Sequence, residues 1–127
     1  MTELSYVALY GLLIVATILA QATLATPQLG LPYLATARDD GRVLQGIAGR
    51  LLRATINSLI GFALFAAAVL ILNAQGRLSP GTLMLAQVVV WTRLAYVVVY
   101  GAGIPWVRTV VWLIPTAATA WLLVLAL

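Results

Sequence analysis

Long runs of apolar residues, separated by short polar stretches, dominate the pattern along the chain. These runs predict four helices at about residues 4–25, 45–72, 81–100 and 106–127. A helix of about 20 apolar residues spans the ~30 Å hydrocarbon core of a bilayer. Pro27 and Pro32 should end the first helix, and Pro115 should kink the fourth or be accommodated by its neighbours. Short turns at 73–80 and 101–105 predict antiparallel neighbours in one four-helix bundle.

The composition agrees with a membrane protein and excludes several kinds of chemistry. Of the 127 residues, 64% are hydrophobic and 8% are charged, whereas soluble domains carry about 25% charged residues. The mean hydropathy is +1.09. The absence of cysteine and histidine excludes disulfides, thiol nucleophiles, imidazole catalysis and thiolate or imidazole metal ligands. The acids Glu3, Asp39 and Asp40 lie outside the apolar runs, which argues against a proton relay, a transporter or a channel.

All basic residues are arginines, and the net charge is +4. They are scattered among apolar runs, so a nucleic-acid partner is not expected. Most of them lie on one side of the predicted bundle: Arg38, Arg42, Arg50, Arg53 and Arg108. Only Arg77 lies on the other side. The positive-inside rule therefore predicts that the connections between helices one and two and between helices three and four are cytoplasmic, with both termini outside.

Two sets of polar residues interrupt the apolar helices at helical spacing. In each set the positions are i, i+3 and i+7, which share one face of a helix. The sets are Arg50, Arg53 and Asn57 in the second helix and Arg93, Tyr96 and Tyr100 in the third. Arg93 lies about 18 Å along its helix from Gly81, which is deeper than snorkelling easily explains. We therefore expect Arg93 to face the bundle interior or a cleft between subunits.

Each of these sets has a structural and a functional interpretation. Arg50 and Arg53 lie near a helix end and can snorkel to lipid headgroups, while Asn57 can join helices by hydrogen bonding. Arg108 and Trp106 fit an interfacial belt with a positive-inside charge. In the functional interpretation, the arginines at 50, 53, 93 and 108 bind an anionic, carboxylate-rich ligand or a lipid headgroup. Phe62, Phe65, Trp91 and Trp112 are interpreted as packing or lipid-facing residues, and Gly61 as a close-packing position without chemistry.

The two sets resemble motifs of the MAPEG family, the membrane-associated proteins in eicosanoid and glutathione metabolism. The family's second helix typically reads Arg-x-x-Arg-Ala-x-x-Asn-x-x-Glu, and its third often reads Arg-x-x-Tyr-x-x-x-Tyr. The second-helix motif is matched by Arg50, Arg53, Ala54 and Asn57, and the third-helix motif by Arg93, Tyr96 and Tyr100. Residues 103–108 are similar to the Gly-Ile-Pro-Trp-x-Arg stretch of bacterial members.

The resemblance implies an all-α, integral membrane four-helix bundle that forms one domain over residues 1–127. It implies a homotrimer with ligand sites between subunits, in a bacterial inner membrane, where the arginine asymmetry makes both termini periplasmic. The implied activity is a glutathione-dependent transferase or peroxidase that acts on lipophilic electrophiles. Arg108 would stabilise the glutathione thiolate, and the remaining site residues would position the peptide: Arg50, Arg53, Asn57, Arg93, Tyr96 and Tyr100.

The chain departs from the family motif at three positions. Ile60 stands where the family usually has a glutamate, which in enzymatic members helps to hold the amino end of glutathione. Gly61 stands where an aromatic residue is common, and Ala63 replaces a proline. Isoleucine cannot accept a hydrogen bond from an ammonium. We therefore keep an alternative to the glutathione-dependent activity. In this alternative the protein is a non-enzymatic lipid-binding protein or an accessory subunit of a larger membrane complex.

Overall fold

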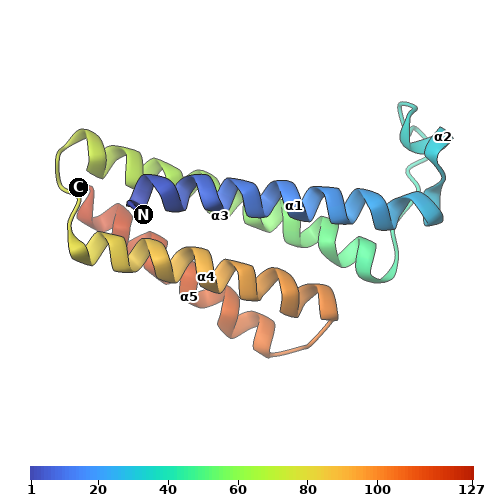
Figure 1. The fold of residues 1–127 in the computed structure, drawn as a ribbon. Coiled ribbons are helices and arrows are strands. Elements are labelled where there is room, and N and C mark those ends of the chain that lie inside the picture. Colours follow the sequence, from blue (N-terminus) through green and yellow to red (C-terminus); the bar gives the residue numbers. More distant parts are fainter.

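The computed structural model describes residues 1–127, and all of its regular secondary structure is helical (Figure 1). Four long helices are joined by turns, and a short helix follows the first: α1 (Glu3–Leu29), α2 (Leu31–Leu34), α3 (Gly46–Ala74), α4 (Pro80–Ala102) and α5 (Val107–Leu125). All four long helices are long and apolar enough to cross a membrane. The prediction of an all-α bundle with four helices able to span a membrane is therefore confirmed.

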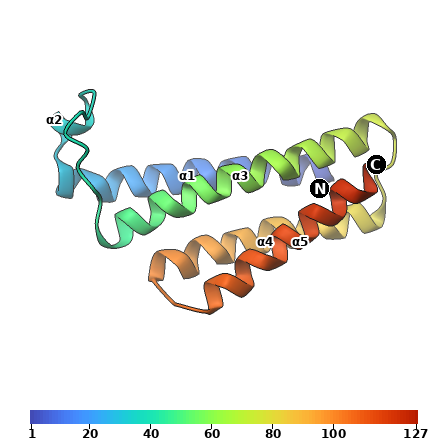
Figure 2. The same ribbon diagram turned by 180° about the vertical axis from the view of Figure 1, so that it is seen from behind.

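The bundle consists of two helical hairpins that lie against each other. In Figure 1 and Figure 2, α1 and α3 run side by side above α4 and α5, and both termini lie at the same end. Both α3 and α4 contact each of the other three long helices, whereas α1 and α5 do not touch. Residues on α3 and α4 therefore have the best access to a site shared by several helices.

The apolar core has two parts, separated by a polar layer. The larger part lies toward the termini and is built around fully buried side chains that include Tyr10, Phe65 and Leu122. The smaller part lies toward the connection between α4 and α5 and consists of Leu51, Ala54, Tyr96 and Val97. Along both α3 and α4, the residues between these two parts include the polar side chains that form the candidate site.

The starts of α1 and α4 are fixed by matching capping boxes. Thr2 and Ser5 cap α1 reciprocally, and Ser79 and Thr82 cap α4 in the same way. The Thr82 hydroxyl also donates to the carboxylate of Glu3 at 2.7 Å. This buried contact joins the first turns of both helices, where a negative charge is favourable to the helix dipoles.

The first helix continues beyond its predicted end near residue 25. It runs through Pro27 to Leu29 and ends at Gly30, whose φ of +81° suits glycine and whose N–H bonds to the carbonyl of Thr26. Pro27 lies in the last turn, where its missing N–H removes one helical hydrogen bond and few further turns depend on it. Pro115 likewise lies inside α5 without interrupting it.

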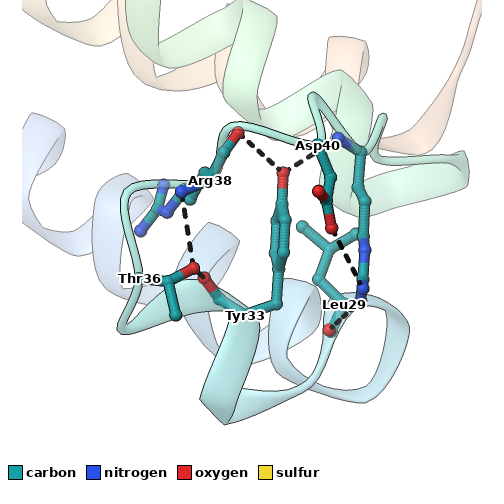
Figure 3. Close-up of polar contacts among 6 residues, drawn as sticks. Leu29, Tyr33, Thr36, Arg38 and Asp40 are labelled. Carbon is teal, nitrogen blue, oxygen red and sulfur yellow. Dashed lines mark hydrogen bonds and ion pairs between the residues drawn. The ribbon is translucent and has the colours of Figure 1, made fainter.

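The segment between α1 and α3 is folded around Tyr33 on the short helix α2, which the sequence pattern did not predict. The Tyr33 hydroxyl accepts a hydrogen bond from the backbone N–H of Arg42 at 2.8 Å and donates to the carbonyl of Arg38 at 3.4 Å (Figure 3). The Arg42 guanidinium stacks 4.4 Å from the Tyr33 ring centre and bonds to the carbonyl of Leu29 and to Asp40. Arg38 and Arg42 therefore serve the folding of this segment.

Candidate functional site

The amide of Asn57 is the junction of the polar layer. Its Oδ1 accepts hydrogen bonds from Arg93 Nη1 on α4 at 3.0 Å and from Trp112 Nε1 on α5 at 3.1 Å. Only the amide oxygen can accept both donors, so this network fixes the orientation of the amide. Asn57 thus links three helices through one atom, and its Nδ2 makes no hydrogen bond within the chain.

Arg93 lies deep in the bundle, pressed against the backbone of α3. Only 3% of its surface is exposed, and its guanidinium lies 5.1 Å from the ring centre of Tyr96 and 5.9 Å from that of Tyr10. A Cβ atom at Gly61 would lie 2.7 Å from Arg93 Nη2 and 2.8 Å from the Tyr10 hydroxyl. Gly61 is therefore the position that leaves room for the guanidinium.

No carboxylate faces this buried cation. Glu3 is bonded to Thr82 near the termini, and Asp39 and Asp40 lie in the segment before α3. The Nε of Arg93 has no hydrogen-bond partner at all. Taking an ion out of water costs several kcal/mol, and here cation–π contacts and one amide oxygen are the only compensation within the chain.

A second group of cations surrounds Tyr100, closer to the connection between α4 and α5. Arg53 Nε donates to the Tyr100 hydroxyl at 3.2 Å, and the Arg108 guanidinium lies 5.3 Å from the Tyr100 ring centre. A pocket of about 150 Å³ adjoins this group and is lined by Asn57, Tyr96, Tyr100, Arg108, Thr109 and Trp112. Helices α3, α4 and α5 all contribute to this small pocket.

A larger pocket of about 370 Å³ lies on the other side of the contact between Asn57 and Trp112. Arg93, Asn57 and threonines on α5 form its polar lining, and its apolar lining includes Ile60, Leu64 and Leu123. Ile60 is exposed at this pocket, next to the buried guanidinium. The two pockets share the side chains of Asn57 and Trp112, which form the wall between them.

Arg50 is directed away from both pockets. Its Nε donates to the carbonyl of Gly101 at 2.9 Å, in the last turn of α4. A Cβ at Gly103, the αL residue that ends α4, would lie 3.3 Å from the Arg50 guanidinium carbon. A cation at this place satisfies an end carbonyl and the negative end of the helix dipole. This geometry gives Arg50 a structural contact, and a role for it in ligand binding stays a prediction.

The predicted site residues therefore fall into three places. The small pocket is lined by Asn57, Tyr96, Tyr100 and Arg108, and Arg53 is bonded to Tyr100 at its rim. Arg93 lines the large pocket. Arg50 is bonded to the last turn of α4. Sequence reasoning missed Trp112, which was interpreted as a packing or lipid-facing residue. Trp112 follows Arg108 by four residues, and this i, i+4 spacing was the available signal.

The arrangement suits an acidic ligand better than a metal ion. No group of histidine, cysteine, aspartate and glutamate side chains is placed to hold a metal ion. The side chains that are free to bind are guanidiniums, hydroxyls and one amide N–H₂ group. Such donors bind carboxylates and stabilise a developing negative charge.

Comparison with known proteins agrees with the helical pattern. A family model described as the MAPEG family matches residues 4–127, nearly the whole chain. No curated protein and no solved structure matches the chain.

Proposed function

This chain belongs to the MAPEG family, and on that basis we propose that it is a glutathione-dependent transferase or peroxidase acting on lipophilic electrophiles in the membrane. The observation that supports this activity best is the group of Arg53, Tyr100 and Arg108 beside Asn57. It gathers two cations and several donors from three helices around one pocket. Glutathione would supply the nucleophilic thiol, since the chain has no cysteine.

In this proposal Arg108 is the catalytic residue. A guanidinium beside a thiol favours the ionised form, which is the nucleophile in thiol chemistry. Arg53 and the Tyr100 hydroxyl hold the acidic ends of the peptide, and the Nδ2 of Asn57 donates to a carbonyl or carboxylate. The electrophile enters from the lipid and reaches the thiolate through the exposed apolar surface of α3 and α5.

Thermal unfolding in detergent tests the binding step. Millimolar glutathione should raise the melting temperature of the wild-type protein, because a ligand that binds only the folded state stabilises it. The protein should also conjugate a generic electrophile such as a chloronitrobenzene. Arg108→Gln should lose turnover, whereas Arg77→Gln, at the opposite end of the bundle, should leave both signals unchanged. The activity would be refuted if the wild-type protein showed no shift in melting temperature with glutathione and no turnover of the electrophile.

A second candidate function is non-enzymatic lipid binding or service as an accessory subunit of a larger membrane complex. It is favoured by Ile60, which removes an acceptor from the cleft and leaves the 370 Å³ pocket largely apolar. This candidate predicts that a tightly held anionic lipid or a protein partner copurifies with the chain. A pure protein that is active with glutathione would contradict it.

We also propose a homotrimer in a bacterial inner membrane, with periplasmic termini and with the α1–α3 and α4–α5 connections in the cytoplasm. Many large apolar side chains of α3 are exposed outside the pockets, including Ile56, Leu59 and Leu70, and a neighbouring subunit or lipid would cover them. Light scattering of the purified protein measures the number of subunits. Because the chain is free of cysteine, single cysteines introduced at Ser5 or Asp39 report the topology by labelling.

A further inference from the structure

We propose that the cleft selects acidic thiol ligands that carry no free ammonium group, so that an N-acylated peptide thiol binds better than the corresponding free amine. This inference names the ligand class of the proposed glutathione-type site and rests on the proposed function. It follows from what the cleft offers to a ligand at the depth of Asn57.

The one amide oxygen at this depth is already used twice. Asn57 Oδ1 accepts from both Arg93 Nη1 and Trp112 Nε1, so it offers little to a further donor. The group that Asn57 still presents is Nδ2, which is a donor. An entering ammonium group would therefore meet a donor where it needs an acceptor.

The charges around Asn57 point the same way. Arg93 is buried without a carboxylate partner, and its Nε is unpaired. Arg53 and Arg108 add two further cations on the small-pocket side. The oxygen acceptors that remain are hydroxyls, such as those of Thr116 and Thr119, which cannot neutralise a cation. An ammonium group in this place stays unpaired and repelled by like charges.

The large pocket provides space for an acyl group instead. Its wall next to Asn57 is formed by Ile60 and, one turn further along α3, by Leu64. An acyl chain on the ligand nitrogen removes the positive charge and buries its apolar part against these side chains. The acyl carbonyl accepts a hydrogen bond, which suits the unpaired Nδ2 of Asn57 on the pocket lining.

The test compares two ligands that differ only at the nitrogen: glutathione and N-acetylglutathione. Binding to the full-length protein in detergent is measured by calorimetry. We expect N-acetylglutathione to bind at least tenfold more tightly, which corresponds to about 1.4 kcal/mol. Ile60→Glu places a carboxylate beside Arg93 and should reverse this preference. Ile56→Glu, one turn earlier on α3 and outside both pockets, is the matched control and should keep the wild-type preference.

Two further variants keep the inference testable if a glutamate within this apolar helix impairs folding. Ile60→Gln adds an acceptor without a charge, and Trp112→Phe removes one of the two donors that occupy Asn57 Oδ1. Both should reduce the preference for N-acetylglutathione over glutathione. A general loss of stability would not change this preference. A wild-type protein that binds both ligands equally, or glutathione more tightly, would overturn the inference and leave the proposed function standing. If neither ligand binds and neither supports turnover, both this inference and the proposed function would be overturned.

Discussion

Replacing Gly61 by alanine should destabilise the protein, although alanine is the better helix former. The added Cβ would lie 2.7 Å from Arg93 Nη2 and 2.8 Å from the Tyr10 hydroxyl. Tyr10 has no open space to move into, because it is fully buried and bonded to the carbonyl of Ser58, and a shift of Arg93 toward the pocket that it lines would disturb its hydrogen bond to Asn57. One of these polar contacts must therefore break.

The expected size follows from three opposing contributions. Overpacking in a tight core costs about 1–3 kcal/mol. Loss of the hydrogen bond between Arg93 and Asn57 costs about 1.5–3 kcal/mol, because the donor is charged. Replacing a glycine by alanine in a helix interior stabilises the helix by about 1 kcal/mol and offsets part of this loss. The net result is a loss of about 2 kcal/mol or more in the free energy of unfolding.

Equilibrium unfolding in detergent, followed by tryptophan fluorescence, measures this change. Gly11→Ala in α1 is the matched control, because the nearest atoms to its new Cβ are on the Phe62 ring at 3.9 Å. It should stabilise the protein by up to about 1 kcal/mol. In a background with Arg93→Ala and Tyr10→Phe, the penalty of Gly61→Ala should vanish. A Gly61→Ala protein as stable as Gly11→Ala would refute the close approach of Arg93 to α3.

Three other substitutions test separate parts of the structure. Arg50→Gln should lower the free energy of unfolding by about 1–2 kcal/mol in the same assay, because the last turn of α4 loses a charged donor to a carbonyl. An unchanged value would show that Arg50 does not stabilise the end of α4. Glu3→Ala should cost about 1–3 kcal/mol, and Glu3→Gln less, because an amide oxygen still accepts from the Thr82 hydroxyl; equal losses would mean that this hydrogen bond contributes nothing. Tyr100→Phe should weaken the calorimetric affinity for glutathione about fivefold by releasing Arg53, and an unchanged affinity would contradict its place in the site.

The fold was predictable from sequence because the physical signal is strong and local. Four apolar runs of membrane-spanning length leave few alternatives to a helical bundle. The end of α1 was less predictable, since the effect of Pro27 depends on its place within the last turn. The short helix α2 depends on Tyr33 bonding to residues five and nine positions further along the chain. Hydropathy carries no signal for such contacts.

The candidate site was predictable only as far as helical spacing reaches. The i, i+3, i+7 pattern placed Arg93, Tyr96 and Tyr100 on one face of α4, but seven residues span about 10 Å along a helix. The two ends of the pattern therefore serve different pockets. The contact between Trp112 and Asn57 joins residues 55 positions apart. It depends on how α5 is rotated against α3, and no pattern within either helix determines that rotation.

The two main departures from the family motif have a common physical explanation. An aromatic side chain at position 61 would occupy the space in which the Arg93 guanidinium lies, as even a single Cβ there comes within 2.7 Å of Nη2. A glutamate at position 60 would line the same pocket as Arg93 and neutralise it. With glycine and isoleucine in these places, Arg93 lies close to α3, bonds to the amide oxygen of Asn57 and has no carboxylate partner. The cleft is therefore more positive and poorer in acceptors than the family motif implies. For that reason the acidic groups of a ligand are favoured here and its ammonium group is not.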